Sequence, residues 1–430
     1  MGGLAAKAIA SVQRYRQQTV GLLLYQSVLN TPISRALIDL LDMLCIEDSA
    51  QCLIAYGVWF RTLAEHQQTW QAHLLEQILI ADNPFSQQAQ RYPIQELPAA
   101  LLEAARHDLT CLQTLYTCQC SQLSQWVQTV CQIPDAPVVW DLEQEPSQAI
   151  SFFGLPDWQD GLVELATYYQ NQGVGIFGQY SVFRWQTECL VGIAHPDPVK
   201  LGDLAAYDYP RQQLLRNTEF LLNGSPALHV LLYGSRGSGK SSLVKALVNE
   251  YGDRGLRLIE VGKAELVNLP TIVEQVRNLP QKFIIFVDDL SFEEDDDAFK
   301  ALKVVLEGSV DARARNVVVY ATSNRRHLVR EYFSERPRPQ DQDEIQAWDT
   351  LQEKLSFSDR FGLTLTFEAA DQKTYLAIVG HLATQAQIPL PQDEIERRAL
   401  QWATRHNGRS GRTARQFIDF LAADLTVEVI

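Results

Sequence analysis

Residues 227–252 read "ALHVLLYGSRGSGKSSLVKALVNEYG" and join an apolar run to a glycine-rich turn and a helical pattern. Their spacing fits G-x-x-x-x-G-K-S/T in the required order of strand, loop and helix. Glycines let backbone N–H groups curve around an anion, and the dipole of the following helix directs its positive end there. The stretch therefore predicts a phosphate-binding loop made of Gly234, Ser235, Arg236, Gly237, Ser238, Gly239, Lys240, Ser241 and Ser242.

Two side chains of this loop have separate chemical tasks. The ammonium group of Lys240 can neutralise the β and γ phosphates of a nucleotide, and the hydroxyl of Ser241 can bind Mg²⁺. We therefore expect ATP and Mg²⁺ as the cofactors.

A second apolar run ends in acid about 50 residues further on, which is where such proteins hold the metal and activate water. This run reads "KFIIFVDDLSFEEDDDAFK" over residues 282–300. Asp288 is the expected indirect ligand of Mg²⁺, and Asp289 is the candidate to orient or deprotonate the attacking water. Glu293 is the alternative base, from the following loop. The acids at 294–297 fit the N-terminus of a helix instead, where negative charge is favourable.

Five apolar runs alternate with helical stretches after residue 226, which predicts a parallel five-stranded sheet covered on both faces. They lie at residues 227–234, 256–261, 282–289, 316–324 and 363–368. Apolar residues at helical spacing predict an all-helical N-terminal domain over 1–133. A linker with a helix and an aromatic hairpin follows at 134–200. The α/β core takes 201–369, and a helical segment takes 370–430.

Composition restricts the class of protein. The 430 residues have a net charge of −15, and residues 1–190 hold 8 of the 37 basic residues, so the first part has no basic footprint for nucleic acid. No apolar run reaches the roughly 18 residues that a membrane span needs. The seven cysteines lack metal-ligand spacing and predict buried thiols in a reducing compartment. We expect a cytoplasmic protein.

Three further motifs make the chain resemble an AAA+ ATPase: "ATSNRRHL" at 321–328, "LSFSDRFGL" at 355–363 and "SGRTARQF" at 410–417. The combination also resembles the bacterial group called domain of unknown function family 815, over roughly residues 150–430. The resemblance implies an AAA+ P-loop sheet with a C-terminal helical lid. Most relatives use Glu at the position of Asp289, so Glu293 stays open as the base.

The resemblance also implies roles for residues outside the loop. Asn324 corresponds to the sensor-1 residue that holds the attacking water. Arg360 corresponds to an arginine finger that reaches the nucleotide of a neighbouring subunit, the alternative being a structural ion pair with Asp359 or Glu353.

Two more positions of the resemblance concern the nucleotide's own subunit. Arg415 corresponds to the sensor-2 arginine of the lid, with Arg412 as the competitor. Tyr207 is expected near the adenine, because the stretch before the first core strand covers the base in AAA+ proteins.

These roles imply an ATPase that works as a homo-oligomeric ring and remodels or assembles a protein partner, which the helical first part would bind. One alternative is a nucleic-acid loader, supported by arginines such as Arg325 and Arg326 but disfavoured by the net charge of −15. Another is a nucleotide-gated scaffold with little hydrolysis, compatible with Asp at position 289.

Overall fold

The structure is a computed structural model that describes residues 2–142, 151–291, 297–307, 314–324, 356–406 and 408–428. It divides into two compact units, Met1–Gln179 and Tyr180–Ile430. Glu293, Arg325, Arg326 and Glu353 lie outside the described residues.

The first unit is helical, as predicted for residues 1–133. Its helices are α1 (Gly2–Val20), α2 (Pro32–Ile46), α3 (Ser49–His66), α4 (Trp70–Leu79), α5 (Pro84–Ala89), α6 (Ala99–Tyr116), α7 (Cys120–Cys131), α8 (Leu162–Gln172) and α9 (Ile176–Gln179). Short 3₁₀ turns join them, among them η1 (Tyr25–Leu29).

Capping residues and prolines set where several of these helices begin. Thr31 accepts a hydrogen bond from the backbone of Ser34, and Pro32 occupies the first turn of α2. Asn83 forms a reciprocal capping box at α5, which again has proline in its first turn. Proline suits this place because its missing N–H would have no partner inside the helix.

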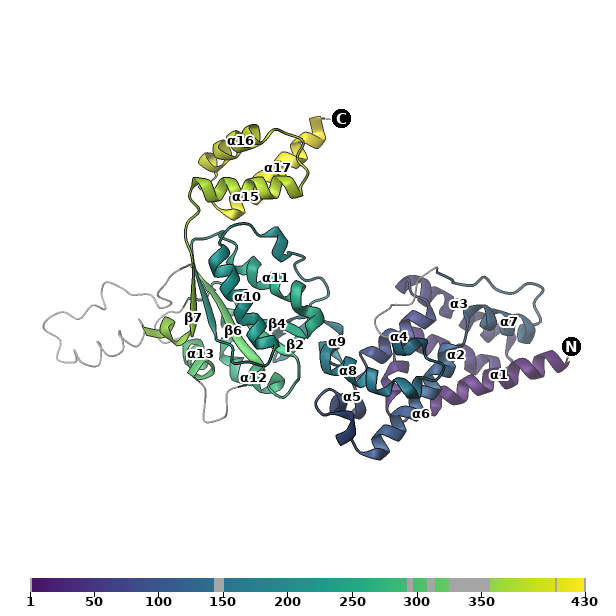
Figure 1. Ribbon diagram of the computed structural model, residues 1–430. Coiled ribbons are helices and arrows are strands. Elements are labelled where there is room, and N and C mark those ends of the chain that lie inside the picture. The colour runs from purple at the N-terminus through teal and green to yellow at the C-terminus, as the bar shows by residue number, and fades with distance from the viewer. Residues whose placement is uncertain are drawn as a thin grey trace, which may run out of the picture. The chain divides into compact units, whose positions relative to one another are not determined.

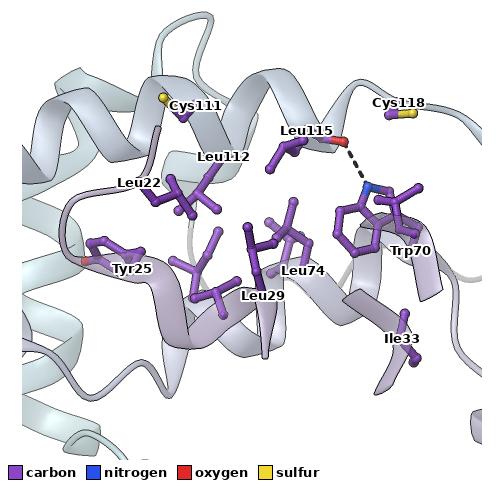
Figure 2. Close-up of a cluster of buried hydrophobic side chains, with 14 of the residues drawn as sticks. Leu22, Tyr25, Leu29, Ile33, Trp70, Leu74, Cys111, Leu112, Leu115 and Cys118 are labelled. Carbon is purple, nitrogen blue, oxygen red and sulfur yellow. Dashed lines mark hydrogen bonds between the residues drawn. The ribbon is translucent and has the colours of Figure 1, made fainter. Parts of the chain in front are cut away.

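The core of the helical unit is apolar and continuous from α1 to α8. Figure 2 shows part of it, where Leu29 and Leu74 face Leu112 and Leu115 of α6. The indole of Trp70 is buried there and donates to the carbonyl oxygen of Leu115 at 2.8 Å. That bond satisfies the polar atom of a large side chain that otherwise contributes hydrophobic burial.

The boundary between the units differs from the linker expected at 134–200. Helix α8 belongs to the helical unit, since the hydroxyl of its buried Tyr169 donates to the carbonyl oxygen of Ile78 at 2.7 Å. Gly173 caps the end of α8 with a φ of 85°. The aromatic hairpin that follows belongs instead to the second unit, so the chain divides after Gln179.

The second unit contains one sheet of seven strands in the order β2-β1-β4-β5-β6-β3-β7. The five predicted strands are β3 (Val230–Gly234), β4 (Leu256–Glu260), β5 (Lys282–Val287), β6 (Val317–Ser323) and β7 (Leu363–Phe367), and their neighbours pair in parallel. The predicted parallel α/β sheet is thus confirmed, while the expected number of strands was too small.

The two additional strands come from the hairpin, β1 (Val182–Gln186) and β2 (Cys189–Gly192). Strand β1 pairs in parallel with β4, and β2 is antiparallel to β1. The hairpin covers an edge of β4 that would otherwise leave a row of backbone groups without partners.

Helices cover both faces of the sheet (Figure 1). Helices α10 (Asp208–Leu222) and α11 (Lys240–Tyr251) share a hydrophobic core with one face. Helices α12 (Leu269–Val276) and α13 (Asp297–Glu307) lie on the other. The lid consists of α15 (Gln372–Gln385), α16 (Gln392–Arg405) and α17 (Gly411–Glu428), with a core of its own.

Two observations bear on the expected cellular setting. Among the described residues, no helix combines the length and the apolar character that crossing a membrane requires. All seven cysteines are free thiols, and Cys189 on the edge strand β2 is exposed, so the expectation that the thiols are buried is wrong for this residue.

Candidate nucleotide-binding site

The glycine-rich loop leaves β3 and enters α11 through left-handed backbone conformations. Gly237 and Gly239 have φ values of 73° and 88°, and Gly239 directly precedes the first residue of α11. A Cβ atom on Gly234 would lie 1.9 Å from the carbonyl oxygen of Phe367, so β7 packs directly against the start of the loop. Only glycine satisfies these conditions at little cost, which explains the glycine spacing.

Lys240 reaches back over the loop from the first turn of α11. Its Nζ donates to the carbonyl oxygens of Gly234 at 3.1 Å and Ser235 at 2.8 Å. The residue is only 6% exposed, and this burial lowers the pKa of the ammonium group, while Asp288 and Asp289 act in the opposite direction. Both carboxylates therefore lie close enough to favour the charged form of Lys240.

A cavity of about 650 Å³ opens above the loop. One part of its wall is mostly apolar and comes from Val199, Leu204, Ala205, Ala206, Tyr207, Phe367, Ile378 and Leu382, while the charged Asp203 and Arg211 also belong to the lining. The other part is polar and comes from Arg236, Gly237, Ser238, Gly239, Lys240, Ser241, Ser242, Asp288, Asp289, Thr322, Asn324, Arg412 and Arg415. A cavity with an apolar end and a phosphate-binding end has the chemistry that a nucleotide requires.

The two acids at the end of β5 have different partners. Oδ1 of Asp288 accepts hydrogen bonds from the hydroxyls of Ser241 at 2.6 Å and Thr322 at 2.5 Å. Asp289 has a φ of 51°, and its Oδ1 accepts a hydrogen bond of 2.6 Å from Nδ2 of Asn324. The sequence placed these acids correctly at a strand end, and the structure brings Ser241, Asp288, Asp289 and Asn324 to one wall of the cavity.

The oxygen donors at this wall fit a magnesium ion. Mg²⁺ prefers carboxylate, hydroxyl and water oxygens, and in nucleotide sites it takes further ligands from the phosphates. Ser241 and Asp288 supply a hydroxyl and a carboxylate that are hydrogen-bonded to each other. In the described part of the chain, no group of three or more His, Cys, Asp or Glu side chains could hold a metal by itself.

Thr322 belongs to this wall and was not expected there. It lies near the end of β6, inside a strand whose seven residues are all buried, and it reads as one more strand residue after "VVVYA". The sequence did offer a signal for Thr322: a threonine near the end of a buried strand, close to the predicted sensor residue Asn324, has a hydroxyl that needs a polar partner.

Gly234 and Ser235 lie at the edge of the predicted loop and do not line the cavity. The backbone N–H of Ser235 donates to the carbonyl oxygen of Phe367 at 3.0 Å, which anchors the loop to β7. Arg236, Ser238 and Ser242 do line the cavity.

Tyr207 lines the cavity, and its place near the adenine stays a prediction. Its ring packs against that of Phe367 with centroids 5.2 Å apart, and its hydroxyl donates to the carbonyl oxygen of Glu368 at 2.8 Å. Burial raises the pKa of the phenol, with Asp371 and Glu368 adding to the effect.

Both lid arginines reach the cavity. Arg412 lies nearer to the loop, because its backbone N–H donates to the carbonyl oxygen of Gly237 at 3.2 Å and its charge lowers the pKa of Lys240. Arg415 also lines the wall, one turn further along α17. Both candidates for the sensor-2 role thus line the cavity, and Arg412 makes the closer contact with the loop.

Arg360 does not line the cavity. It ends the 3₁₀ turn η9 (Ser356–Arg360), and its Nε is paired with the carboxylate of Glu307 at the end of α13. Glu307 was not among the partners considered from the sequence, because residue 307 is brought near only by the packing of α13 against η9. Glu353 lies outside the described residues.

Comparison with known protein families finds a match over most of the second unit. The family described as "Protein of unknown function (DUF815)" matches residues 178–425, which covers the sheet, the cavity and the lid. The chain belongs to this family. The membership leaves the activity open, since the DUF815 description names none.

Similarities to other proteins cover a short segment or have low sequence identity and low TM-scores. The replication factor C large subunit of Staphylothermus marinus is 38% identical over 69 residues, so the match spans 16% of this DUF815 chain and 16% of that protein. The RuvB Holliday junction branch migration motor of Thermotoga maritima is 13% identical with a TM-score of 0.33, over 52% of this chain and 72% of that one. The FIGL-1 AAA domain in complex with ADP is 16% identical with a TM-score of 0.37, over 55% and 76%.

Proposed function

We propose that the protein binds ATP with Mg²⁺ in the cavity above the glycine-rich loop and hydrolyses it. The observation that carries the proposal is the connected set of side chains at one wall: Ser241 is bonded to Asp288, and Asn324 is bonded to Asp289. A phosphate-binding loop alone would account for binding. The acids of β5, held by hydroxyl and amide groups, add what metal binding and water activation need.

Each side chain then has a task in phosphoryl transfer. Lys240 leaves the carbonyl oxygens of the loop and binds the β and γ phosphates. Ser241 and Asp288 would hold Mg²⁺, which neutralises phosphate charge when bound. Asp289 accepts the proton of the attacking water, or orients it, while Asn324 fixes the carboxylate in position. Glu293 remains the alternative base.

The remaining roles concern the lid and the subunit interface. Arg412 and Arg415 contact the nucleotide from the lid, and Tyr207 contacts the base. Arg360 acts on the nucleotide of a neighbouring subunit, so the working form is a homo-oligomeric ring. ATP turnover in that ring drives the remodelling or assembly of a protein partner bound by the helical unit, in the cytoplasm.

A second candidate is a nucleotide-gated scaffold that binds ATP and scarcely hydrolyses it. The pairing of Arg360 with Glu307 within one chain favours this candidate, because a paired arginine is not available to a neighbouring subunit. Nucleic acid is the less favoured partner, given the net charge of −15.

Phosphate release measured against protein concentration, together with light scattering, distinguishes the two functions. The ATPase in a ring predicts that turnover per chain rises with concentration as the assembly forms. Binding of ATP without phosphate release at any concentration would support the scaffold. Absence of ATP binding would contradict both.

A further inference from the structure

Thr322 is a buried polar residue at a place that favours an apolar one. It is 2% exposed, and the preceding residues Val317 to Ala321 of β6 are apolar apart from the hydroxyl of Tyr320. A buried hydroxyl costs free energy unless it is hydrogen-bonded. Its contacts therefore show what it contributes.

The hydroxyl of Thr322 contacts both neighbouring acids of β5. It donates to Oδ1 of Asp288 at 2.5 Å and accepts from the backbone N–H of Asp289 at 2.9 Å. A carboxylate can only accept and an N–H can only donate, so the direction of both bonds is fixed. One hydroxyl thus joins the side chain of the first acid to the backbone of the second.

The register of the sheet brings these residues together. Strands β5 and β6 are parallel neighbours with Val287 opposite Ala321, and Asp288 and Thr322 each come next along their strands. The carbonyl oxygen of Thr322 also accepts from the backbone N–H of Leu290 at 2.7 Å. Thr322 therefore holds the chain on both sides of Asp289.

Asp289 needs such support. Its φ of 51° is in the left-handed region, which is unfavourable for residues with a Cβ atom. The two bonds from Thr322 to the backbone at 289 and 290 stabilise this turn. This backbone conformation directs the carboxylate of Asp289 toward the amide of Asn324.

We propose that Thr322 is a positioning residue that orients Asp288 toward the metal and Asp289 toward the water. This inference rests on the proposed function. Because Ser241 and Thr322 both donate to Oδ1 of Asp288, the serine proton is committed to the carboxylate and the serine oxygen keeps its lone pairs for Mg²⁺. Partners of metal ligands commonly contribute 10- to 100-fold to metal affinity or activity.

The test compares Thr322→Val, which keeps the shape and removes the hydroxyl, with Thr322→Ser, which keeps the hydroxyl. Thr218→Val is the matched control. Thr218 is a fully buried threonine of α10 in the same unit, and its hydroxyl bonds to Leu214 and Tyr320, away from the cavity. It reports what the loss of any buried threonine hydroxyl does.

Two quantities are measured for each variant: the gain in ATP affinity on adding Mg²⁺, and kcat. Thr322→Val should reduce both by roughly 10- to 100-fold and leave the ATP affinity without Mg²⁺ unchanged. Thr322→Ser should restore both to within a few fold. Thr218→Val should lower the melting temperature and change neither quantity.

The outcomes separate this inference from the proposed function. If the wild type binds ATP in a Mg²⁺-dependent way without hydrolysis, the proposed ATPase is wrong, and the affinity measurement still tests Thr322. If Thr322→Val behaves like Thr218→Val in both quantities, or if Thr322→Ser restores neither, the inference is overturned. A wild type that binds no ATP, or binds it equally with and without Mg²⁺, overturns the inference as well.

Discussion

Nδ2 of Asn324 lies 2.6 Å from Oδ1 of Asp289 and donates a hydrogen bond to it. The two residues are 35 positions apart and meet because β5 and β6 are parallel neighbours that end at the same edge of the sheet. An amide donor fixes the direction in which the carboxylate that accepts from it points. Asp289 is thus a carboxylate aimed by the protein at one side of the cavity.

Replacing Lys240 tests the binding end of the cavity. Lys240→Ala should weaken ATP binding roughly 100-fold, because the charged hydrogen bonds to the phosphates are lost. Calorimetry provides the affinity. Lys245→Ala is the control, since Lys245 lies on the same helix, near Asp197 at 3.8 Å, and does not line the cavity. Equal affinity of Lys240→Ala and Lys245→Ala would exclude a phosphate role for Lys240.

Replacing Arg360 tests whether subunits act on one another. Arg360→Ala should bind ATP normally and hydrolyse it roughly 10³- to 10⁵-fold more slowly, as expected for a lost arginine finger. Mixing it with Lys240→Ala should restore part of the turnover, because hybrid rings pair an intact loop with an intact finger. Phosphate release is measured against the mixing ratio.

Two further variants sharpen this experiment. Glu307→Gln removes the charge that pairs with Arg360 in the same chain, so turnover should rise or stay constant if Arg360 is a finger. Arg415→Ala mixed with Lys240→Ala should show no recovery, because both changes affect the nucleotide's own subunit. A mixture of Arg360→Ala and Lys240→Ala that never exceeds the sum of its components would contradict the ring.

Replacing Asp108 should cause a large loss of stability in the helical unit. The fully buried carboxylate accepts hydrogen bonds from the backbone N–H groups of Leu23, Leu24 and Tyr25 at 2.7 to 3.0 Å, which begins the turn η1. In Asp108→Asn, one of the two oxygens becomes an NH₂ group that faces the backbone N–H of Leu23, and the remaining hydrogen bonds lose the strength that the charge gives them, at a cost of about 3 kcal/mol. Hydrogen exchange of α6 measures this loss, with the exposed Asp39→Asn as the control. Equal protection in both variants would contradict it.

The lowered pKa of His73 should make the stability of the same unit depend on pH. Burial lowers the pKa of this imidazole from 6.5 to about 4, and its Nδ1 faces Oε1 of Gln68 at 3.1 Å. Between these pKa values the unfolded chain binds a proton that the folded chain does not, so stability falls as pH decreases from about 6.5 toward 4. A His73→Gln variant should lose less stability over this range in urea unfolding. An unchanged slope would contradict the prediction.

The sequence was most informative where the chemistry is local. The loop from Gly234 to Ser242 is one contiguous segment, and Asp288 and Asp289 directly follow an apolar strand, so spacing alone located them. Contacts between distant segments were not accessible in this way. The pairing of β1 with β4, the ion pair of Arg360 with Glu307 and the position of Thr322 all depend on packing that a single sequence does not show.

Under the proposed function, Asp289 turns a nucleotide-binding site into a catalytic one, and steady-state phosphate release by Asp289→Asn measures this contribution. Without a carboxylate to accept the proton of water, turnover should fall roughly 10²- to 10⁴-fold while ATP affinity stays that of the wild type. Wild-type turnover by Asp289→Asn, measured beside Glu293→Gln, would contradict the claim, and a loss confined to Glu293→Gln would transfer the catalytic role to that residue.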